Sequence, residues 1–523
     1  MLLKAHHIKY YVQDRLLLDL DQLEIHRKDR IGLVGRNGSG KTTLIKILAG
    51  VLAPEEGKIN HHIKCDLIPQ LKRTDTVKSG GEITQEYINK ALIKDSGLLF
   101  ADEPTTHLDT DHIEWLEKKL DQWNGAFMIV SHDRAFLDAL CTKIWEINEG
   151  KIKEYTGNYS SYIEQKELER KQEKMAYEIY EKQKSQLENA LKLKEQKAER
   201  ATKAPKRVSN SEARITGAKP YFAKKQKKLQ QTAKALETRL EKLEKVEKVK
   251  ELPPLKMNLP NEENIKDKII LRVQEVAGMI GDRILWKGIS FNVRGGDKLA
   301  IIGPNGSGKT TFVKKIMKQE QGITLSPSVK MGYFSQNLNI LDVEKSIIEN
   351  IQSTSQQDET LIRTVLARMH FFRDEVYKPV DVLSGGERVK VALAKLFLSD
   401  INMLILDEPT NFLDMEAVEA LEGLLQEYRG TIIFVSHDRR FIEKLATRIL
   451  AIRDEKMELF EGTYQQYLHY ESQPVRNTSE DRRLVLETKI TEILSRLSIE
   501  PSAELELEFQ KLLKEKRELE ANK

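Results

Sequence analysis

Short apolar runs in the first and last parts of the chain each stop at a group of polar residues. The runs Leu98–Ala101 and Met403–Leu406 end in Asp-Glu, and Ala126–Val130 and Thr431–Val435 end in Ser-His-Asp. A short apolar run followed at once by polar residues is typical of a buried strand. The pattern therefore predicts α/β domains with chemically capable side chains at the strand ends.

The middle of the chain has a helical pattern instead. Residues 160 to 204 are mostly polar and contain no Pro or Gly, which predicts one long helix. A second helix is expected from near Pro220, because apolar residues recur at intervals of four and three, at Leu229, Ala233, Leu236, Leu240 and Leu243. Together they predict an antiparallel hairpin of about 60 Å, with a tip loop at 208–218.

Four sequence blocks occur twice and in the same order. They are GRNGSGKTT at Gly35–Thr43 and GPNGSGKTT at Gly303–Thr311, SGGE at Ser79–Glu82 and Ser384–Glu387, ADEPTTHLD at Ala101–Asp109 and LDEPTNFLD at Leu406–Asp414, and VSHDR at Val130–Arg134 and Val435–Arg439. The repetition predicts two related domains. We place them at 1–160 and 256–470, with the hairpin linker at 161–255 and a charged helical extension at 471–523.

The two repeats differ in length before the SGGE block. Gln70 lies 9 positions before Ser79, whereas Gln336 lies 48 positions before Ser384. The first domain is therefore expected to lack most of a helical subdomain that the second domain keeps. The linker is expected to end at Pro253-Pro254, because paired prolines cannot continue a helix.

The glycine-rich block GxxxxGK[ST] is a phosphate cradle. Glycines after an apolar strand let backbone N–H groups approach the phosphates, and the helix that follows adds a favourable dipole. Lys41 is expected to reach the β- and γ-phosphates of ATP, and Lys309 repeats this role. The expected phosphate-binding residues are Gly35, Asn37, Gly38, Gly40, Lys41, Thr42 and Thr43, with Gly303, Asn305, Gly306, Gly308, Lys309, Thr310 and Thr311 in the second domain.

The polar residues at the strand ends complete each predicted site. An aspartate at a strand tip suits Mg²⁺, and the glutamate after it can orient and activate the attacking water. The expected metal ligands are Thr42, Gln70, Asp102, Thr310, Gln336 and Asp407. The expected catalytic residues are Glu103 and Glu408, with His132 and His437 contacting the γ-phosphate. The alternatives are a capping or surface carboxylate and a buried histidine that has no part in catalysis.

These blocks, in this order and spacing, resemble ABC ATPases. SGGE lies 24 residues before the strand-end glutamate in both halves, and its serine and glycines can form a second phosphate-binding nest. The resemblance implies that the signature of each domain, Ser79-Gly80-Gly81 or Ser384-Gly385-Gly386, completes the ATP site of the other domain. It implies an α/β fold, in which two P-loop nucleotide-binding domains of ABC type are joined by a long antiparallel helical hairpin.

Two positions distinguish the halves. Leu383 precedes the second signature as in most ABC proteins, but Lys78 precedes the first. Tyr11, or its neighbour Tyr10, lies where ABC proteins often stack an aromatic ring on adenine, whereas the corresponding residue of the second domain is Met279. We therefore expect the two sites to differ in nucleotide affinity.

The charge distribution indicates an anionic partner. Net charge is +4, but the segment 192–228 holds 13 Lys/Arg against 3 Asp/Glu and so has a net charge of +10. With Tyr221 and Phe222 inside it, this segment fits RNA, although a solvated coiled-coil spacer is the alternative.

No apolar run is long enough to span a bilayer, and Cys65 and Cys141 cannot form a disulfide framework. We therefore expect a cytoplasmic protein.

Two ABC domains on one chain, a helical hairpin between them and the loops EPTTHLD and EPTNFLD resemble the ABC-F family of ribosome-associated ATPases. Segments such as YVQDRLLL at Tyr11–Leu18 and GAKPYFAKKQKKL at Gly217–Leu229 resemble the Vga-type antibiotic-resistance proteins of staphylococci. The resemblance implies a monomeric ATPase that uses ATP and Mg²⁺ and binds the bacterial 70S ribosome, its rRNA and the tRNA exit site. It would relieve inhibition by lincosamides, pleuromutilins and group A streptogramins. The alternatives are a housekeeping ABC-F translation factor and the ATPase subunit of a membrane transporter.

Overall fold

The computed structural model describes residues 1–69, 88–89, 96–106, 108–200, 218–243, 245, 265–335, 340–411, 413–472, 490, 509–514 and 516. Several predictions therefore lie outside the described residues. They concern the first signature, the shortened helical subdomain beside it, Gln70, Gln336, the hairpin tip, the linker end at Pro253-Pro254 and nearly all of the C-terminal extension.

A six-stranded sheet forms the centre of the first domain. Its order is β5 (Cys65–Ile68), β6 (Leu98–Asp102), β7 (Ala126–Val130), β3 (Arg30–Gly35), β8 (Lys143–Asn148) and β9 (Lys151–Thr156). All neighbours pair in parallel except β8 and β9. A three-stranded antiparallel sheet has the order β2 (Arg15–Ile25), β1 (Leu3–Val12) and β4 (Glu56–His61). The helices with defined bounds in the described part of this domain are α1 (Lys41–Leu48), α3 (Thr110–Asp121) and α4 (Arg134–Leu140).

The second domain repeats this topology. Its large sheet has the order β14 (Met331–Phe334), β15 (Met403–Asp407), β16 (Thr431–Val435), β12 (Lys298–Ile302), β17 (Arg448–Arg453) and β18 (Lys456–Glu461), and its small sheet β11 (Arg283–Arg294), β10 (Ile269–Ile280) and β13 (Ile323–Leu325). Its helices are α8 (Lys309–Lys318), α9 (Ile347–Gln352), α10 (Glu359–Arg368), α11 (Gly385–Leu398), α12 (Met415–Glu427), α13 (Arg439–Leu445) and α14 (Tyr464–Ser472), with 3₁₀ turns η2 (Arg373–Tyr377) and η3 (Val380–Val382).

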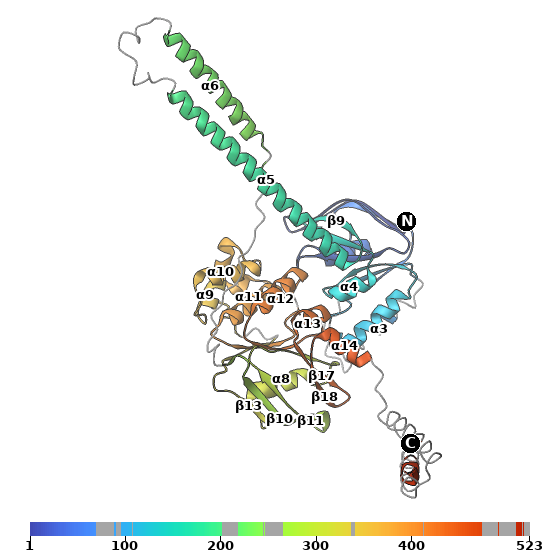
Figure 1. The fold of residues 1–523 in the computed structure, drawn as a ribbon. Helices are drawn as coiled ribbons and strands as arrows, with labels where there is room; N and C mark the ends of the chain where they lie inside the picture. Colours follow the sequence, from blue (N-terminus) through green and yellow to red (C-terminus); the bar gives the residue numbers. More distant parts are fainter. Residues whose placement is uncertain are drawn as a thin grey trace, which may run out of the picture.

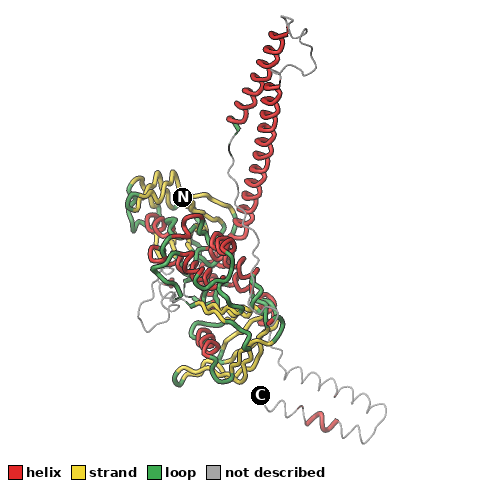
Figure 2. Tube along the Cα trace, turned by 90° about the vertical axis from the view of Figure 1, so that its left-hand side faces the viewer, coloured by secondary structure: helices red, strands yellow, loops and turns green. Residues whose placement is uncertain are grey.

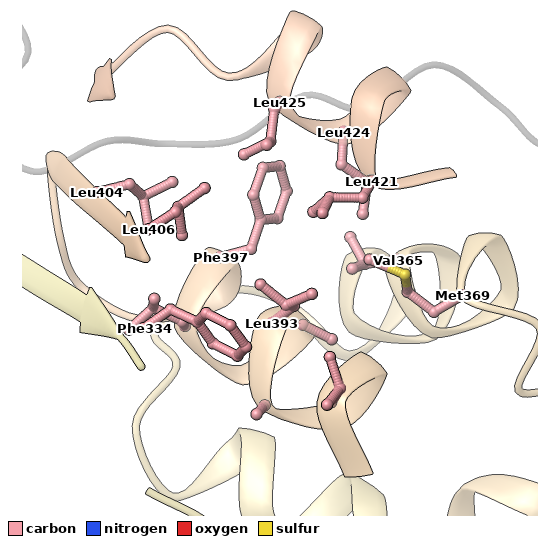
Figure 3. Close-up of a cluster of buried hydrophobic side chains, with 14 of the residues drawn as sticks. Phe334, Val365, Met369, Leu393, Phe397, Leu404, Leu406, Leu421, Leu424 and Leu425 are labelled. Atoms are coloured by element: carbon pink, nitrogen blue, oxygen red, sulfur yellow. The ribbon is translucent and has the colours of Figure 1, made fainter. Parts of the chain in front are cut away.

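Alternate residues of the central strands enter different cores. In β15, Met403 and Ile405 join the core shared with α8 and the small sheet, whereas Leu404 and Leu406 face the opposite core. Figure 3 shows this second core, where Phe397 of α11 lies among side chains of β15, α10 and α12. The helices α9, α10 and α11 gather in one group (Figure 1). This packing fixes the signature residues at the start of α11 relative to the sheet.

The linker is a helical hairpin. Helix α5 (Tyr159–Arg200) leaves the first domain, and α6 (Ala218–Glu241) returns beside its outer part (Figure 1). Both views show the hairpin projecting away from the two domains (Figure 2). The expected fold class, two nucleotide-binding domains of ABC type joined by a helical hairpin, is confirmed.

Candidate ATP sites

The glycine-rich loops lie between a central strand and a helix in both domains. Strand β3 ends at Gly35 and α1 begins at Lys41, and β12 and α8 are separated in the same way. Gly38 has φ +78° and open space where a Cβ would stand, whereas a Cβ on Gly35 would lie 2.7 Å from the carbonyl oxygen of Ile147. Gly40, Gly306 and Gly308 also have positive φ. Only glycines allow this loop to present its N–H groups to an anion.

The two loop lysines point back into their own loops. Lys41 Nζ donates to the carbonyl oxygens of Gly35 at 2.7 Å and Arg36 at 2.9 Å, and Lys309 Nζ donates to those of Gly303 at 2.8 Å and Pro304 at 2.9 Å. Burial lowers the pKa of both ammonium groups. These hydrogen bonds hold each ammonium group within its own glycine-rich loop, where it could contact a bound polyphosphate.

Oxygen atoms suitable for Mg²⁺ lie beside these loops. Thr310 Oγ1 donates to Asp407 Oδ1 at 3.2 Å, at the end of β15. Among the described residues, the buried atoms Asp102 Oδ1, Ser39 Oγ and Ser307 Oγ have no hydrogen-bond partner. Burial raises the pKa of Asp102 and Asp407, and a bound cation would offset that effect. The residues present therefore fit a hard divalent cation with oxygen ligands.

The strand-end glutamates adopt a strained backbone conformation. Glu103 and Glu408 have φ of +52° and +51°, a region that costs a non-glycine residue about 1 kcal/mol or more. Their N–H groups donate to Val130 O at 2.8 Å and Val435 O at 3.0 Å, on the neighbouring strands. In this conformation each side chain lies beside the predicted histidine of its own domain.

Each glutamate lies close to that histidine. His132 Nε2 is 3.3 Å from Glu103 Oε1, and His437 Nε2 is 3.4 Å from Glu408 Oε1. In the second domain, burial raises the pKa of Glu408 to about 7, with Lys309 opposing this shift. Burial, assisted by Lys309, lowers the pKa of His437 to about 3, so this imidazole is neutral near pH 7. The pair has the geometry to handle the proton of an attacking water.

The second signature lies at a helix start. Ser384 caps α11 by accepting from the Glu387 N–H at 3.3 Å, while its own N–H donates to Glu387 Oε2 at 2.9 Å. This capping box leaves Gly385 and Gly386 in the first turn, where free N–H groups can bind an anion. The predicted partners Ser79, Gly80 and Gly81 lie outside the described residues.

The domains also contact one another through two aspartates to which the sequence alone gave no role. Asp109 accepts from the Asn305 N–H of the second glycine-rich loop, and Asp414 accepts from the Asn37 N–H of the first. Both aspartates end a repeated block, EPTTHLD or EPTNFLD. The repeat could therefore have marked these two aspartates as functional. It could not have identified their partners, which lie 196 and 377 residues away in the sequence.

The candidate adenine position differs between the domains. Tyr11 pairs with Leu16 and Met279 pairs with Ile284, so the two residues occupy equivalent places in the small sheets. Tyr10 packs against the core of the first domain, which leaves Tyr11 as the ring available for stacking. Met279 is 57% exposed and carries no aromatic ring.

Comparison with known proteins supports the same interpretation. ABC transporter family profiles match residues 18–77 and 286–411, and a second ABC transporter profile matches residues 145–215. The ribosome protection protein VmlR of Bacillus subtilis (strain 168) is 34% identical over an alignment of 551 positions, which covers 98% of this chain and 97% of VmlR. The erythromycin resistance ATP-binding protein MsrA of Staphylococcus epidermidis is 33% identical, covering 85% of this chain and 96% of MsrA.

The fold has a counterpart among solved structures. The RNase-L Inhibitor structure superposes with a TM-score of 0.58 at 18% identity, covering 89% of this chain and 92% of that protein. Within the described part of the chain, we find no helix with the length and apolar character needed to cross a membrane. From its paired ABC domains, its helical hairpin and its full-length relatives, the chain belongs to the ABC-F family and is an ATP-hydrolysing enzyme.

Proposed function

We propose that this ABC-F ATPase is a ribosome protection factor of the bacterial cytoplasm. It would bind the 70S ribosome as a monomer at the tRNA exit site and relieve inhibition by drugs that act at the peptidyl transferase centre. The observation that carries the proposal is the 34% identity, across almost the whole of both chains, to a protein named for ribosome protection. The Vga-type resemblance of its sequence favours lincosamides, pleuromutilins and group A streptogramins as the drugs.

The proposed ATP sites are composite. Each would combine the glycine-rich loop, strand-end carboxylates and histidine of one domain with the signature of the other. Mg²⁺, when bound, would neutralise phosphate charge, and Thr42, Asp102 and Gln70, or Thr310, Asp407 and Gln336, would hold it. Glu103 and Glu408 would accept a proton from the attacking water, with His132 and His437 orienting them. The short distances between each glutamate and its histidine support these roles.

The surface of the hairpin supports an RNA partner. Lys224, Lys227 and Lys228 are exposed on α6, and Lys192 and Lys197 are exposed on the facing part of α5. The stretch of α6 from Ala218 to Leu236 contains no Asp or Glu, so its exposed lysines attract phosphates and can release counterions when they bind. The hairpin is therefore the part of the chain that we assign to the ribosome.

The root of the hairpin touches the second ABC domain. Tyr159 Oη, in the first turn of α5, donates to Glu419 Oε1 at 3.3 Å, and Arg440 Nη2 donates to Ser160 Oγ at 2.8 Å. Arg440 also lies 2.9 Å from Asp138 of the first domain. A change in how the two domains meet would thus be transmitted to the linker, which gives ATP binding a means to position the hairpin on its partner.

Drug susceptibility tests the proposal. A sensitive bacterial host expressing the chain should tolerate a lincosamide, a pleuromutilin and a group A streptogramin better than the same host expressing the Glu103→Gln/Glu408→Gln variant. A macrolide should be included, because the relative MsrA is named for erythromycin resistance. Equal susceptibility of both strains, with the protein found on sedimented ribosomes, would favour a housekeeping translation factor. If the protein is absent from ribosomes, both the protection factor and the translation factor are rejected, and the ATPase subunit of a transporter remains as the alternative.

The hairpin tip should set the drug spectrum. Deleting Ser209–Gly217 should abolish or redirect resistance, because this loop would lie near the drug, where a shift of about 1 Å changes the fit. ATP hydrolysis and ribosome binding should persist, since the nucleotide sites and most basic residues are untouched. An unchanged spectrum in a well-expressed variant would assign protection to the body of the hairpin instead.

A further inference from the structure

The segments after β7 and β16 that carry His132 and His437 are called the histidine loops below. From each of them an arginine extends across the domain boundary. Arg134 follows His132 by two residues, and Arg439 follows His437 in the same way. Arg134 forms a bidentate ion pair with Glu422 of α12, with Nη1 at 3.0 Å from Oε2. Arg439 makes the corresponding bidentate pair with Glu117 of α3. The two pairs are equivalent members of the repeat, so the contact occurs once on each side of the interface.

The helix that pairs with each arginine also contacts the glycine-rich loop, or phosphate loop, of the same site. Helix α12 begins after Asp414, which accepts from the Asn37 N–H at 3.2 Å, and its Glu416 accepts from Arg36 at 2.8 Å. Glu422, which binds Arg134, lies eight residues after Asp414, about 12 Å along the helix. One rigid helix of the second domain therefore contacts both walls of the first ATP site.

Helix α3 does the same on the other side. Asp109, which caps it, accepts from the Asn305 N–H at 2.9 Å, and Asp111 lies 3.1 Å from Arg453. Glu117, eight residues after Asp109, binds Arg439. The second site is thus spanned by a helix of the first domain in the same order, phosphate loop first and histidine loop second.

We infer that Arg134 and Arg439 are positioning residues for ATP hydrolysis. Each fixes the distance between the histidine loop and the phosphate loop of its own site by binding a helix of the opposite domain. The histidine and glutamate of a site would then be aligned for catalysis only when the other domain is in place. This inference rests on the ATP sites proposed above and is independent of ribosome protection, because it concerns hydrolysis by the purified chain.

The first pair is the more deeply buried of the two, so removing one of its partners should cost more. The side chains of Arg134 and Glu422 are 2% and 3% exposed, whereas those of Arg439 and Glu117 are 18% and 16% exposed. Arg134 also lies 3.2 Å from Asp438, the residue after His437, so it touches the histidine loop of the other site. An ion pair so well shielded from water tolerates little displacement. Substituting Arg134 should therefore impair hydrolysis more than substituting Arg439.

The experiment uses the full-length purified chain and compares kcat with nucleotide affinity. Arg134→Gln and Glu422→Gln should each lower kcat by about tenfold or more, while the Kd of a fluorescent methylanthraniloyl ATP stays within about threefold. Lys444→Gln is the matched control, because Lys444 Nζ donates to the same carboxylate at 2.7 Å from within the second domain. Its kcat should stay within about twofold of the wild type.

A double variant separates positioning from simple stabilisation. Arg134→Met with Glu422→Leu removes both charges and keeps an apolar contact, so the melting temperature should recover relative to either single variant. If the arginine positions the site, kcat of the double variant remains low. Recovery of kcat together with stability would overturn the inference, as would unchanged kcat in the single variants or equal losses in kcat and affinity. If Arg134→Gln fails to fold, Arg134→Lys replaces it, because lysine keeps the charge but loses the bidentate geometry. Its kcat should fall while its nucleotide affinity stays near that of the wild type.

Discussion

The backbone N–H of Asn37, in the first glycine-rich loop, donates to the carboxylate of Asp414 in the second domain at 3.2 Å. The contact recurs in reverse between Asn305 and Asp109 at 2.9 Å. Burial opposes ionisation of both carboxylates, but the hydrogen bonds that they accept, and Lys390 beside Asp414, keep their pKa values below the usual range. Two anions at the domain boundary thus hold the phosphate loops in place.

Replacing Asp414 with Ala should weaken the closed arrangement of the domains. The substitution removes the contact with Asn37 and also the cap of α12, where Asp414 accepts from the Ala417 N–H at 2.9 Å. Loss of a cap costs about 1 kcal/mol of stability, and loss of a hydrogen bond to a charged group costs about 1.5–3 kcal/mol. Small-angle scattering with ATP should show less compaction than in the wild type.

Asp358→Ala is the control for that substitution. Asp358 caps α10 by accepting from the Leu361 N–H at 3.3 Å, within the second domain. It should lower the melting temperature to a similar degree and leave ATP-induced compaction unchanged. If both variants compact as the wild type does, the contact between Asn37 and Asp414 has no role in closure.

The sequence predicted local elements well and cross-domain contacts poorly. Strands such as Ala126–Val130 were predictable because a short apolar run depends only on burial of its own residues. The partners of Arg134 and Asp414 could not be found in this way, because Glu422 is 288 positions from Arg134 and ion pairs follow no periodicity. That Tyr10 and not Tyr11 packs against the core also could not be predicted without the sheet register, which includes an irregularity between these two residues.

Replacing both strand-end glutamates should separate ATP binding from turnover. In Glu103→Gln/Glu408→Gln the lysines and glycine-rich loops are intact, so ATP should still bind. Hydrolysis should fall by a factor of about 100 or more, because a neutral amide cannot accept the proton of the attacking water. Phosphate release measured under single-turnover conditions checks this, and turnover at the wild-type rate would show that another group is the base.

The two adenine positions should contribute unequally to nucleotide binding. Tyr11→Ala should weaken binding at the first site by about 1 kcal/mol or more, the scale of stacking between a base and an aromatic ring. Met279→Ala should have a smaller effect, because the Met279 side chain is largely exposed and has no ring. Site-resolved titrations with a fluorescent nucleotide provide the measurement, and equal losses at both sites would exclude stacking by Tyr11.

The buried pair Arg134 and Glu422 predicts a specific dependence of stability on pH. Burial opposes ionisation of Glu422, but Arg134 and Lys444 together lower its pKa below the ordinary value of 4.5. Because the folded pKa is the lower one, the stabilisation is complete above the unfolded pKa and is lost as pH falls through the folded pKa. The difference in unfolding free energy between wild type and Glu422→Gln should therefore shrink below about pH 4.5, as followed by urea denaturation. A difference that grows towards acid pH would contradict the sign.

The last prediction concerns the charge on the hairpin. Lys224, Lys227 and Lys228 are exposed on the part of α6 near the tip, whereas Lys234 of α6, and Lys242 and Lys245 just after its end, are exposed farther from the tip. Changing the first three to Gln should weaken ribosome binding and reduce the slope of log affinity against log salt by about two, because each phosphate contact contributes roughly 0.7. Co-sedimentation at a series of salt concentrations measures both quantities.

The root-side triple variant is the control of equal charge. Its lysines lie beside acidic residues such as Glu237 and Glu241, which already balance part of their charge. We expect a clearly smaller loss of affinity and a nearly unchanged salt slope, and both variants should hydrolyse ATP at the wild-type rate in the absence of ribosomes. Equal effects of the two triple changes would mean that the hairpin attracts RNA through its total charge. A specific contact surface near the tip would then be excluded, although the nucleotide sites would keep the roles proposed for them.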